Sequence, residues 1–212
     1  MGGRIVLASA SPRRSALLAA AGLAFEAQPT DVPEALEGFD DPAAACRELA
    51  ARKARARAET IRGAALVIGA DTVVAVPLGA SPAAGWELLG KPADAAEARA
   101  MLASLAATRH LVATGVCVVR TPDGASWDDL ERTWVSMRAI SPAELEAYAA
   151  SGEWRGKAGG YAIQETADRF VERLEEGGFD NVVGLPVART LRLLRAAGWS
   201  GAAGLEAPRE RG

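Results

Sequence analysis

The sequence has few of the residues that bind zinc or build disulfide frameworks. Cys46 and Cys117 are its only cysteines and His110 is its only histidine, in a chain of 212 residues. Three such ligands do not complete the four-coordinate shell of a structural zinc site without a carboxylate. Two cysteines form no disulfide framework, so a reducing cytoplasm is the expected compartment. Any chemistry is therefore expected from oxygen-bearing and cationic side chains.

Long apolar runs and an excess of positive charge are also missing. No stretch approaches the ~20 apolar residues that cross a bilayer, and the short apolar run near the N-terminus does not suit a secretory signal. Lys and Arg total 24 against 27 Asp and Glu, a net charge of −3. Such a chain has no general attraction to nucleic acid or to a membrane surface. Binding of an anion would require a local cluster of basic residues.

Common signatures of nucleotide and hydrolase sites are absent as well. The sequence contains no G-x-x-x-x-G-K-[ST], no G-x-G-x-x-G after a strand and no H-E-x-x-H. A Ser-His-Asp triad would depend on His110 alone, and we expect that residue to satisfy backbone groups rather than to catalyse. Chemistry on an anionic ligand, with oxygen-bound magnesium, is the interpretation that remains.

Short aliphatic runs alternate with alanine-rich helical segments along the chain, which predicts an α/β fold with a mixed sheet. Hairpin-like spacing around Pro77 and Pro122 argues against a purely parallel sheet. Residues 1–199 are expected to form one domain, and 200–212 a flexible C-terminal tail. The expected strands are 4–9, 25–29, 66–76, 110–120, 127–140 and 170–174, and the expected helices are 12–22, 41–60, 93–106, 141–152 and 186–197.

The first candidate site is the string Ser-Ala-Ser-Pro-Arg-Arg at 9–14, where a strand leads into a helix. Ser11 suits the N-cap and Pro12 the first helical position. Free N–H groups and the helix dipole favour an anion there. Arg13 and Arg14 oppose that dipole unless a phosphate offsets their charge. The alternative, an N-cap serine with two solvated arginines, is the commoner outcome for such strings taken alone.

The second candidate is Asp71, which interrupts an aliphatic strand. A carboxylate is costly there unless it faces a cleft, pairs with a cation or binds metal, and Gly69 permits close approach of backbone or ligand. Asp71 suits a magnesium ligand or an acceptor of a proton from water. The alternative is a strand-end acid bonded to a neighbouring turn. Because acids are depleted in strands, the functional interpretation is slightly favoured.

Other polar residues give weaker signals. Lys53 shares a helix face with Cys46 and Leu49, so it either points at an anion or extends its charge to solvent, which is commoner. Gln164 ends an apolar run and suits the reading of a base. Taken alone, surface or strand-end positions are the safer interpretation for Lys91, Lys157 and Gln164, and a solvated position for Glu34.

Five motifs occur in the order seen in the Maf family. They are LASASPRR (7–14), GADT (69–72), GKP (90–92), KAGGYAIQ (157–164) and VVGLP (182–186). Each is weak alone, but the ordered set is specific, and the resemblance spans residues 4–197. It implies a Maf/inosine-triphosphatase-like α/β fold, with an elongated mixed central sheet flanked by helices. It also implies two lobes with a nucleoside triphosphate in the cleft between them, commonly in a homodimer.

The resemblance also implies a nucleoside triphosphate pyrophosphatase that cuts dTTP or UTP to the monophosphate and pyrophosphate. Asp71 falls on the general base, and Asp71 with Glu34 would hold a divalent metal, Mg²⁺ or else Mn²⁺. Lys53 and Lys91 fall on lysines that assist catalysis. The substrate-binding positions would be Ser9, Ser11, Arg13, Arg14, Thr72, Lys157 and Gln164. Of these, Arg13, Thr72 and Gln164 resemble the specificity marks of the dTTP/UTP branch.

Two features differ from the family pattern. The stretch between Asp71 and Lys91 is longer than usual, and its extra residues 77–86 suit a longer hairpin or a flap. Residues 165–169 stand where the family usually has glycines. This difference affects the part of the site that is expected to lie beside the nucleotide base. The alternative function is a non-catalytic nucleotide sensor that restrains cell division by binding a partner protein.

Overall fold

A computed structural model describes residues 3–79 and 84–201 of the chain. Its centre is a seven-stranded sheet in the order β2-β1-β3-β5-β6-β7, with β4 paired to β3 outside this path. Strands β1, β2 and β3 run parallel and the other pairs antiparallel, which confirms the mixed sheet. The strands are β1 (Arg4–Leu7), β2 (Glu26–Ala27), β3 (Ala65–Pro77), β4 (Trp86–Leu89), β5 (Arg109–Thr121), β6 (Ser126–Met137) and β7 (Val171–Glu175).

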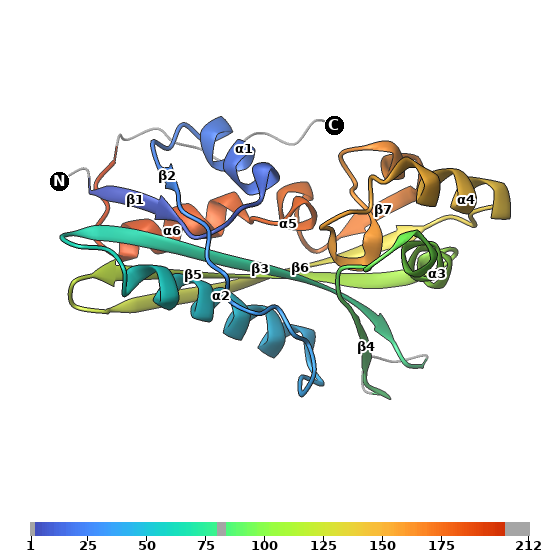
Figure 1. The fold of residues 1–212 in the computed structure, drawn as a ribbon, viewed down its shortest axis with the longest axis horizontal. Coiled ribbons are helices and arrows are strands. Elements are labelled where there is room, and N and C mark those ends of the chain that lie inside the picture. The colour runs from blue at the N-terminus through green and yellow to red at the C-terminus, as the bar shows by residue number, and fades with distance from the viewer. Residues whose placement is uncertain (1–2, 80–83, 202–212) are drawn as a thin grey trace.

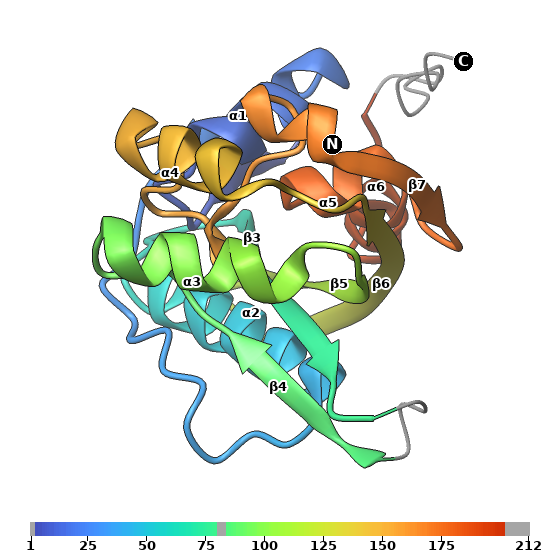
Figure 2. The ribbon, with the colours of Figure 1, turned by 90° about the vertical axis from the view of Figure 1, so that its right-hand side faces the viewer.

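Helices cover both faces of the three long strands (Figure 1). One face of β3 and β5 carries α2, and α5 and α6 lie on the opposite face of the sheet, against β5 and β6. Figure 2 shows α3 and α4 side by side at one end of the molecule. The helices are α1 (Pro12–Ala20), α2 (Pro42–Ala58), α3 (Ala95–Leu105), α4 (Pro142–Ser151), α5 (Phe179–Val183) and α6 (Val187–Ala196), with 3₁₀ turns at Ala158–Gly160 and Thr166–Phe170.

The buried core is divided into two main clusters. One joins β1, α1 and α6, and the other joins α3, α4 and the segment that ends at Phe170. Strands β3 and β5 contribute residues to both, so the long strands connect the two expected lobes. Among the described residues, no helix has the length and apolar character needed to cross a membrane. The predicted tail falls largely on 202–212, outside the described residues.

Helices α1, α2 and α4 start at the predicted position or one residue after it. The Ser11 side chain accepts a hydrogen bond from the Arg14 N–H, Asp41 caps α2, and Ser141 forms a capping box with Glu144. The sequence-based prediction missed β4 and α5, which have only four and five residues. Such short elements contain too little periodicity to be distinguished from loops.

Two glycines allow α2 to lie unusually close to the sheet. A Cβ built on Gly69 would lie 2.2 Å from the Ala50 carbonyl oxygen, and one on Gly115 would lie 2.5 Å from that of Cys46. The helix backbone therefore rests directly on β3 and β5. This close approach brings Lys53, on the same helix, within hydrogen-bonding reach of Asp71.

We expect Gly115→Ala to lower the free energy of unfolding by about 1–3 kcal/mol, the usual cost of overpacking a close contact. The added methyl group would push α2 away from β5, so turnover should fall as well. Urea unfolding and a rate assay measure the two effects. Gly3→Ala is the matched control, because no atom lies within 4 Å of its added Cβ. Unchanged stability in Gly115→Ala would show that this contact does not set the helix position.

Candidate active site

The candidate site lies where one edge of β3 has no neighbouring strand. Strand β1 pairs with β3 as far as Ile68, and β4 pairs with it from Val74 onward. Residues 69–73 therefore have no strand partner on this edge, although their other edge pairs continuously with β5. A cavity of about 260 Å³ opens at this gap, lined by both Asp71 and Thr72. Successive side chains of a strand point to opposite faces of the sheet. Asp71 therefore extends into the cavity from one face and Thr72 from the other.

Asp71 belongs to a run of alternating carboxylates and ammonium groups. The Lys53 Nζ donates to both Asp71 Oδ1 and Glu34 Oε1, the latter at 2.5 Å, and Lys91 donates to Glu34 Oε2. Lys53 and Asp71 are 4% and 6% exposed. Burial alone would raise the pKa of Glu34, but the two ammonium groups outweigh it and lower that pKa to about 2. The four groups carry no net charge together.

Arg14 connects the first motif to the other side of the cavity. Its Nε donates to the Gly184 carbonyl at 2.8 Å, Nη1 to Ser9 Oγ at 3.2 Å and Nη2 to Thr72 Oγ1 at 3.2 Å. Burial lowers the pKa of Arg14, and the nearby charge of Asp71 partly offsets this. The guanidinium is thus held in one orientation by three elements that lie far apart in the sequence.

The remaining cationic residues have different surroundings. Arg13 is half-buried, and burial followed by repulsion from Arg14 lowers its pKa. Lys157 is buried and its Nζ donates to the Glu153 carbonyl and, at 2.6 Å, to Glu165. Glu165 lies in the segment that departs from the family pattern, and sequence reasoning did not identify it as a partner of Lys157.

Most of the predicted site residues gather around one cavity. Ser9 and Lys53 do not line it, but each is one hydrogen bond from a residue that does. Sequence reasoning missed most of the apolar lining, because buried strand residues give no functional signal. The predicted residues on the wall are Ser11, Arg13, Arg14, Glu34, Asp71, Thr72, Lys91, Lys157 and Gln164. The apolar lining includes Leu36, Val74, Leu89, Val112, Tyr161, Ile163, Val182 and Val183.

The prediction for His110 was wrong in one respect. Its Nε2 lies 2.9 Å from the Tyr161 hydroxyl, so it pairs with a side chain rather than with backbone groups. Burial lowers its pKa to about 3, which keeps the ring neutral. His110 stands behind Tyr161, which itself lines the cavity.

Asp71 and Glu34 are the carboxylates available to a divalent metal at the cavity. The described part of the chain holds no group of three or more His, Cys, Asp or Glu side chains placed to bind one ion. Mg²⁺ is commonly bound by one or two carboxylates, with substrate phosphates and water completing its shell. Two carboxylates that share Lys53 fit that pattern only if the substrate supplies the other ligands.

The chain is similar to several known proteins over most of its length. The family model described as "Maf-like protein" matches residues 4–197. A dTTP/UTP pyrophosphatase of Anaeromyxobacter dehalogenans is 44% identical over 201 residues, 94% of this chain and 96% of that protein. One of Salinibacter ruber is 47% identical over 194 residues, 91% of this chain and 90% of that protein. A solved nucleoside-triphosphatase / dITP/XTP pyrophosphatase of Mycobacterium abscessus matches more distantly, with 24% identity, a TM-score of 0.38, and coverage of 65% of this chain and 75% of that one.

Proposed function

Because this chain belongs to the Maf-like family, we propose that it hydrolyses dTTP or UTP to the nucleoside monophosphate and pyrophosphate. The names and high coverage of its relatives support this activity. The structural observation that carries it is the buried Asp71 carboxylate on the wall of a cavity that Arg13, Lys91 and Lys157 also line. A carboxylate beside several cations suits attack by water on a polyanion.

In the proposed reaction, Asp71 accepts a proton from a water molecule that attacks the α-phosphorus. A bond forms between the water oxygen and the α-phosphorus, and the bond from that phosphorus to the α,β-bridging oxygen breaks. Lys53 holds the Asp71 carboxylate in place through its hydrogen bond to Oδ1. Asp71 and Glu34 would hold a divalent metal, Mg²⁺ or Mn²⁺, that offsets phosphate charge when bound.

The phosphates are proposed to bind between the start of α1 and Lys91. Ser11 and Arg13 lie at the N-terminus of that helix, where backbone N–H groups and the dipole attract anions. Lys91 and Lys157 line the same cavity and would offset the charge on the leaving pyrophosphate. Thr72 and Gln164 are then left to contact the base.

The proposal extends to a homodimer that works in the cytoplasm, in line with the family resemblance. Sedimentation of the purified chain measures its oligomeric state. The alternative, a nucleotide sensor that acts on a cell-division partner, needs substrate binding but no hydrolysis.

A panel of triphosphates tests the activity. The purified protein is incubated with dTTP, UTP, CTP, ATP and GTP, with Mg²⁺ or Mn²⁺, and pyrophosphate and orthophosphate are measured separately. We expect pyrophosphate from dTTP and UTP above the other nucleotides, and its loss when a chelator removes the metal. Failure to release pyrophosphate from any of them would favour the sensor.

A further inference from the structure

Two buried residues behind the cavity wall control the hydroxyl of Thr72. The Oγ1 atoms of Thr72 and Thr114 lie 3.0 Å apart, and Thr114 Oγ1 donates to the Asn181 carbonyl at 2.9 Å. Thr114 and Asn181 are both 0% exposed, whereas Thr72 lines the cavity. Thr72 lies in β3, Thr114 in β5 and Asn181 in α5. In that order they form a hydrogen-bonded chain that leads from the cavity into the protein interior.

The direction of each hydrogen bond in this chain is determined by the chemistry of the groups. A backbone carbonyl cannot donate, so the single O–H of Thr114 must point at Asn181. The Thr114 oxygen can then only accept from Thr72, and this uses the single O–H of Thr72. A guanidinium cannot accept either, so Arg14 Nη2 occupies one lone pair of Thr72. One lone pair of Thr72 is left, and toward the cavity that hydroxyl can act only as an acceptor.

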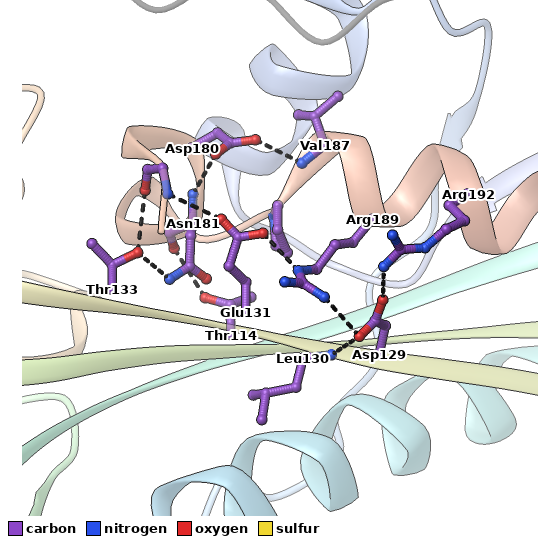
Figure 3. A network of polar contacts seen from close by, with 12 residues as sticks. Thr114, Asp129, Leu130, Glu131, Thr133, Asp180, Asn181, Val187, Arg189 and Arg192 are labelled. Carbon is purple, nitrogen blue, oxygen red and sulfur yellow. Dashed lines mark hydrogen bonds and ion pairs between the residues drawn. The ribbon is translucent and has the colours of Figure 1, made fainter. Parts of the chain in front are cut away.

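Asn181 is itself held firmly, so the end of the chain cannot rotate away. Its Nδ2 donates to the Val112 carbonyl at 3.1 Å and to Thr133 Oγ1 at 2.8 Å. Figure 3 shows this arrangement, with Asn181 between Thr114 and Thr133.

The short helix α5, which contains Asn181, is also bonded to neighbouring elements near both of its ends. The Gly178 N–H donates to Glu131 Oε1 at 3.0 Å, and Arg189 Nε donates to Glu131 Oε2 at 2.7 Å. The Val187 N–H donates to Asp180 at 2.7 Å. Figure 3 shows Glu131 with Arg189, and Asp180 with Val187. The Asn181 carbonyl therefore presents a fixed acceptor to Thr114.

The position of Thr72 suits contact with a base rather than with phosphates. It points to the face of the sheet opposite Asp71, because the two are consecutive in β3. Val112, Val182 and Val183 line the same cavity. Thr72 is an uncharged acceptor in a partly apolar cavity, with Arg14 bonded to its other lone pair, and such an acceptor matches the edge of a flat, neutral ring.

We propose that Thr114 is a positioning residue that makes Thr72 an obligate hydrogen-bond acceptor, and that Thr72 thereby selects bases with an N3–H. This inference rests on the proposed dTTP/UTP activity. Uracil and thymine carry a proton on N3, which meets the free lone pair of Thr72. Cytosine carries a lone pair on N3, so two acceptors would face each other. A site that leaves a buried polar group unpaired rejects the wrong ligand strongly.

The test compares kcat/KM for UTP and CTP in Thr114→Val and in the wild type. Without Thr114, the Thr72 O–H has no acceptor in the wall and can turn toward the cavity as a donor. We expect the UTP-to-CTP ratio to fall by about tenfold, in the range set by one unpaired hydrogen bond. Thr114→Ser keeps the hydroxyl and should retain the ratio.

Thr121→Val is a second control, because it removes another hydrogen-bonded hydroxyl from the far end of the same strand. A merely structural effect would lower the rates for UTP and CTP together and leave their ratio unchanged. An unchanged ratio in folded Thr114→Val would overturn the inference. If wild-type protein cleaves neither dTTP nor UTP, the proposed function itself fails, which is a separate outcome.

A measurement on the wild type covers the case in which Thr114→Val does not fold. N3-methyl-UTP replaces the N3–H by a methyl group and leaves the phosphates unchanged. We expect its kcat/KM to fall by at least tenfold relative to UTP. Equal turnover of the two nucleotides would show that Thr72 does not read N3.

Discussion

Replacement of Asp71 by asparagine is expected to slow pyrophosphate release on the order of 10²–10⁴-fold, the usual contribution of a positioned proton acceptor. Asparagine keeps the shape of the side chain and a carbonyl oxygen that still accepts from Lys53. It removes the negative charge and the ability to take a proton from water. The fold should therefore persist while kcat falls. Steady-state rates with UTP, together with thermal unfolding, measure the two effects separately.

Asp123→Asn provides the matched control for that variant. Asp123 is an exposed carboxylate that pairs with Arg120 and does not line the cavity. Its replacement should leave turnover of UTP close to that of the wild type. If Asp71→Asn retained near-full turnover, another group would have to accept the proton, and the proposed role of Asp71 would be wrong.

The second large effect is expected from Lys53→Met. The methionine fills similar space within the core, but it leaves Asp71 without an ammonium partner and Glu34 with Lys91 alone. We expect kcat/KM to fall on the order of 10²–10³-fold, as when one preorganised electrostatic group is removed from an active site. The buried Asp71 carboxylate also loses its cation, so the melting temperature should fall as well.

Arg52→Met separates this effect from a general disturbance of α2. Arg52 precedes Lys53 on the same helix, but its side chain is exposed and pairs with Glu48. We expect little change in rate or stability. A Lys53→Met enzyme within twofold of the wild-type rate would show that the Asp71 carboxylate is positioned by other contacts.

The sequence contained enough information to place the long elements and most of the polar site. Ser11, Asp41 and Ser141 start helices because their side chains accept backbone N–H groups, a local effect that spacing reveals. The resemblance brought together residues from five motifs, and nine of the predicted side chains line one cavity.

Lys53 shows where local reasoning fails. Its position on a helix face leaves two outcomes open, and extension of the charge to solvent is the commoner one for such a lysine taken alone. The ammonium group lies inside because Gly69 and Gly115 draw the helix onto the sheet and Asp71 supplies an opposite charge. Neither the distance between helix and sheet nor a partner 18 residues away can be read from the neighbours of a lysine.

The open edge of β3 could not be predicted either, because it depends on where two other strands stop pairing. Its five residues span about 17 Å at the usual rise of a strand, and β1 and β4 close it at both ends. Unpaired strand edges can recruit strands from other molecules. Here residues 69–73 are buried or partly buried, and Asp71 and Thr72 of this edge line the cavity. The edge that would otherwise be free to pair thus forms part of a wall that a small solute can reach.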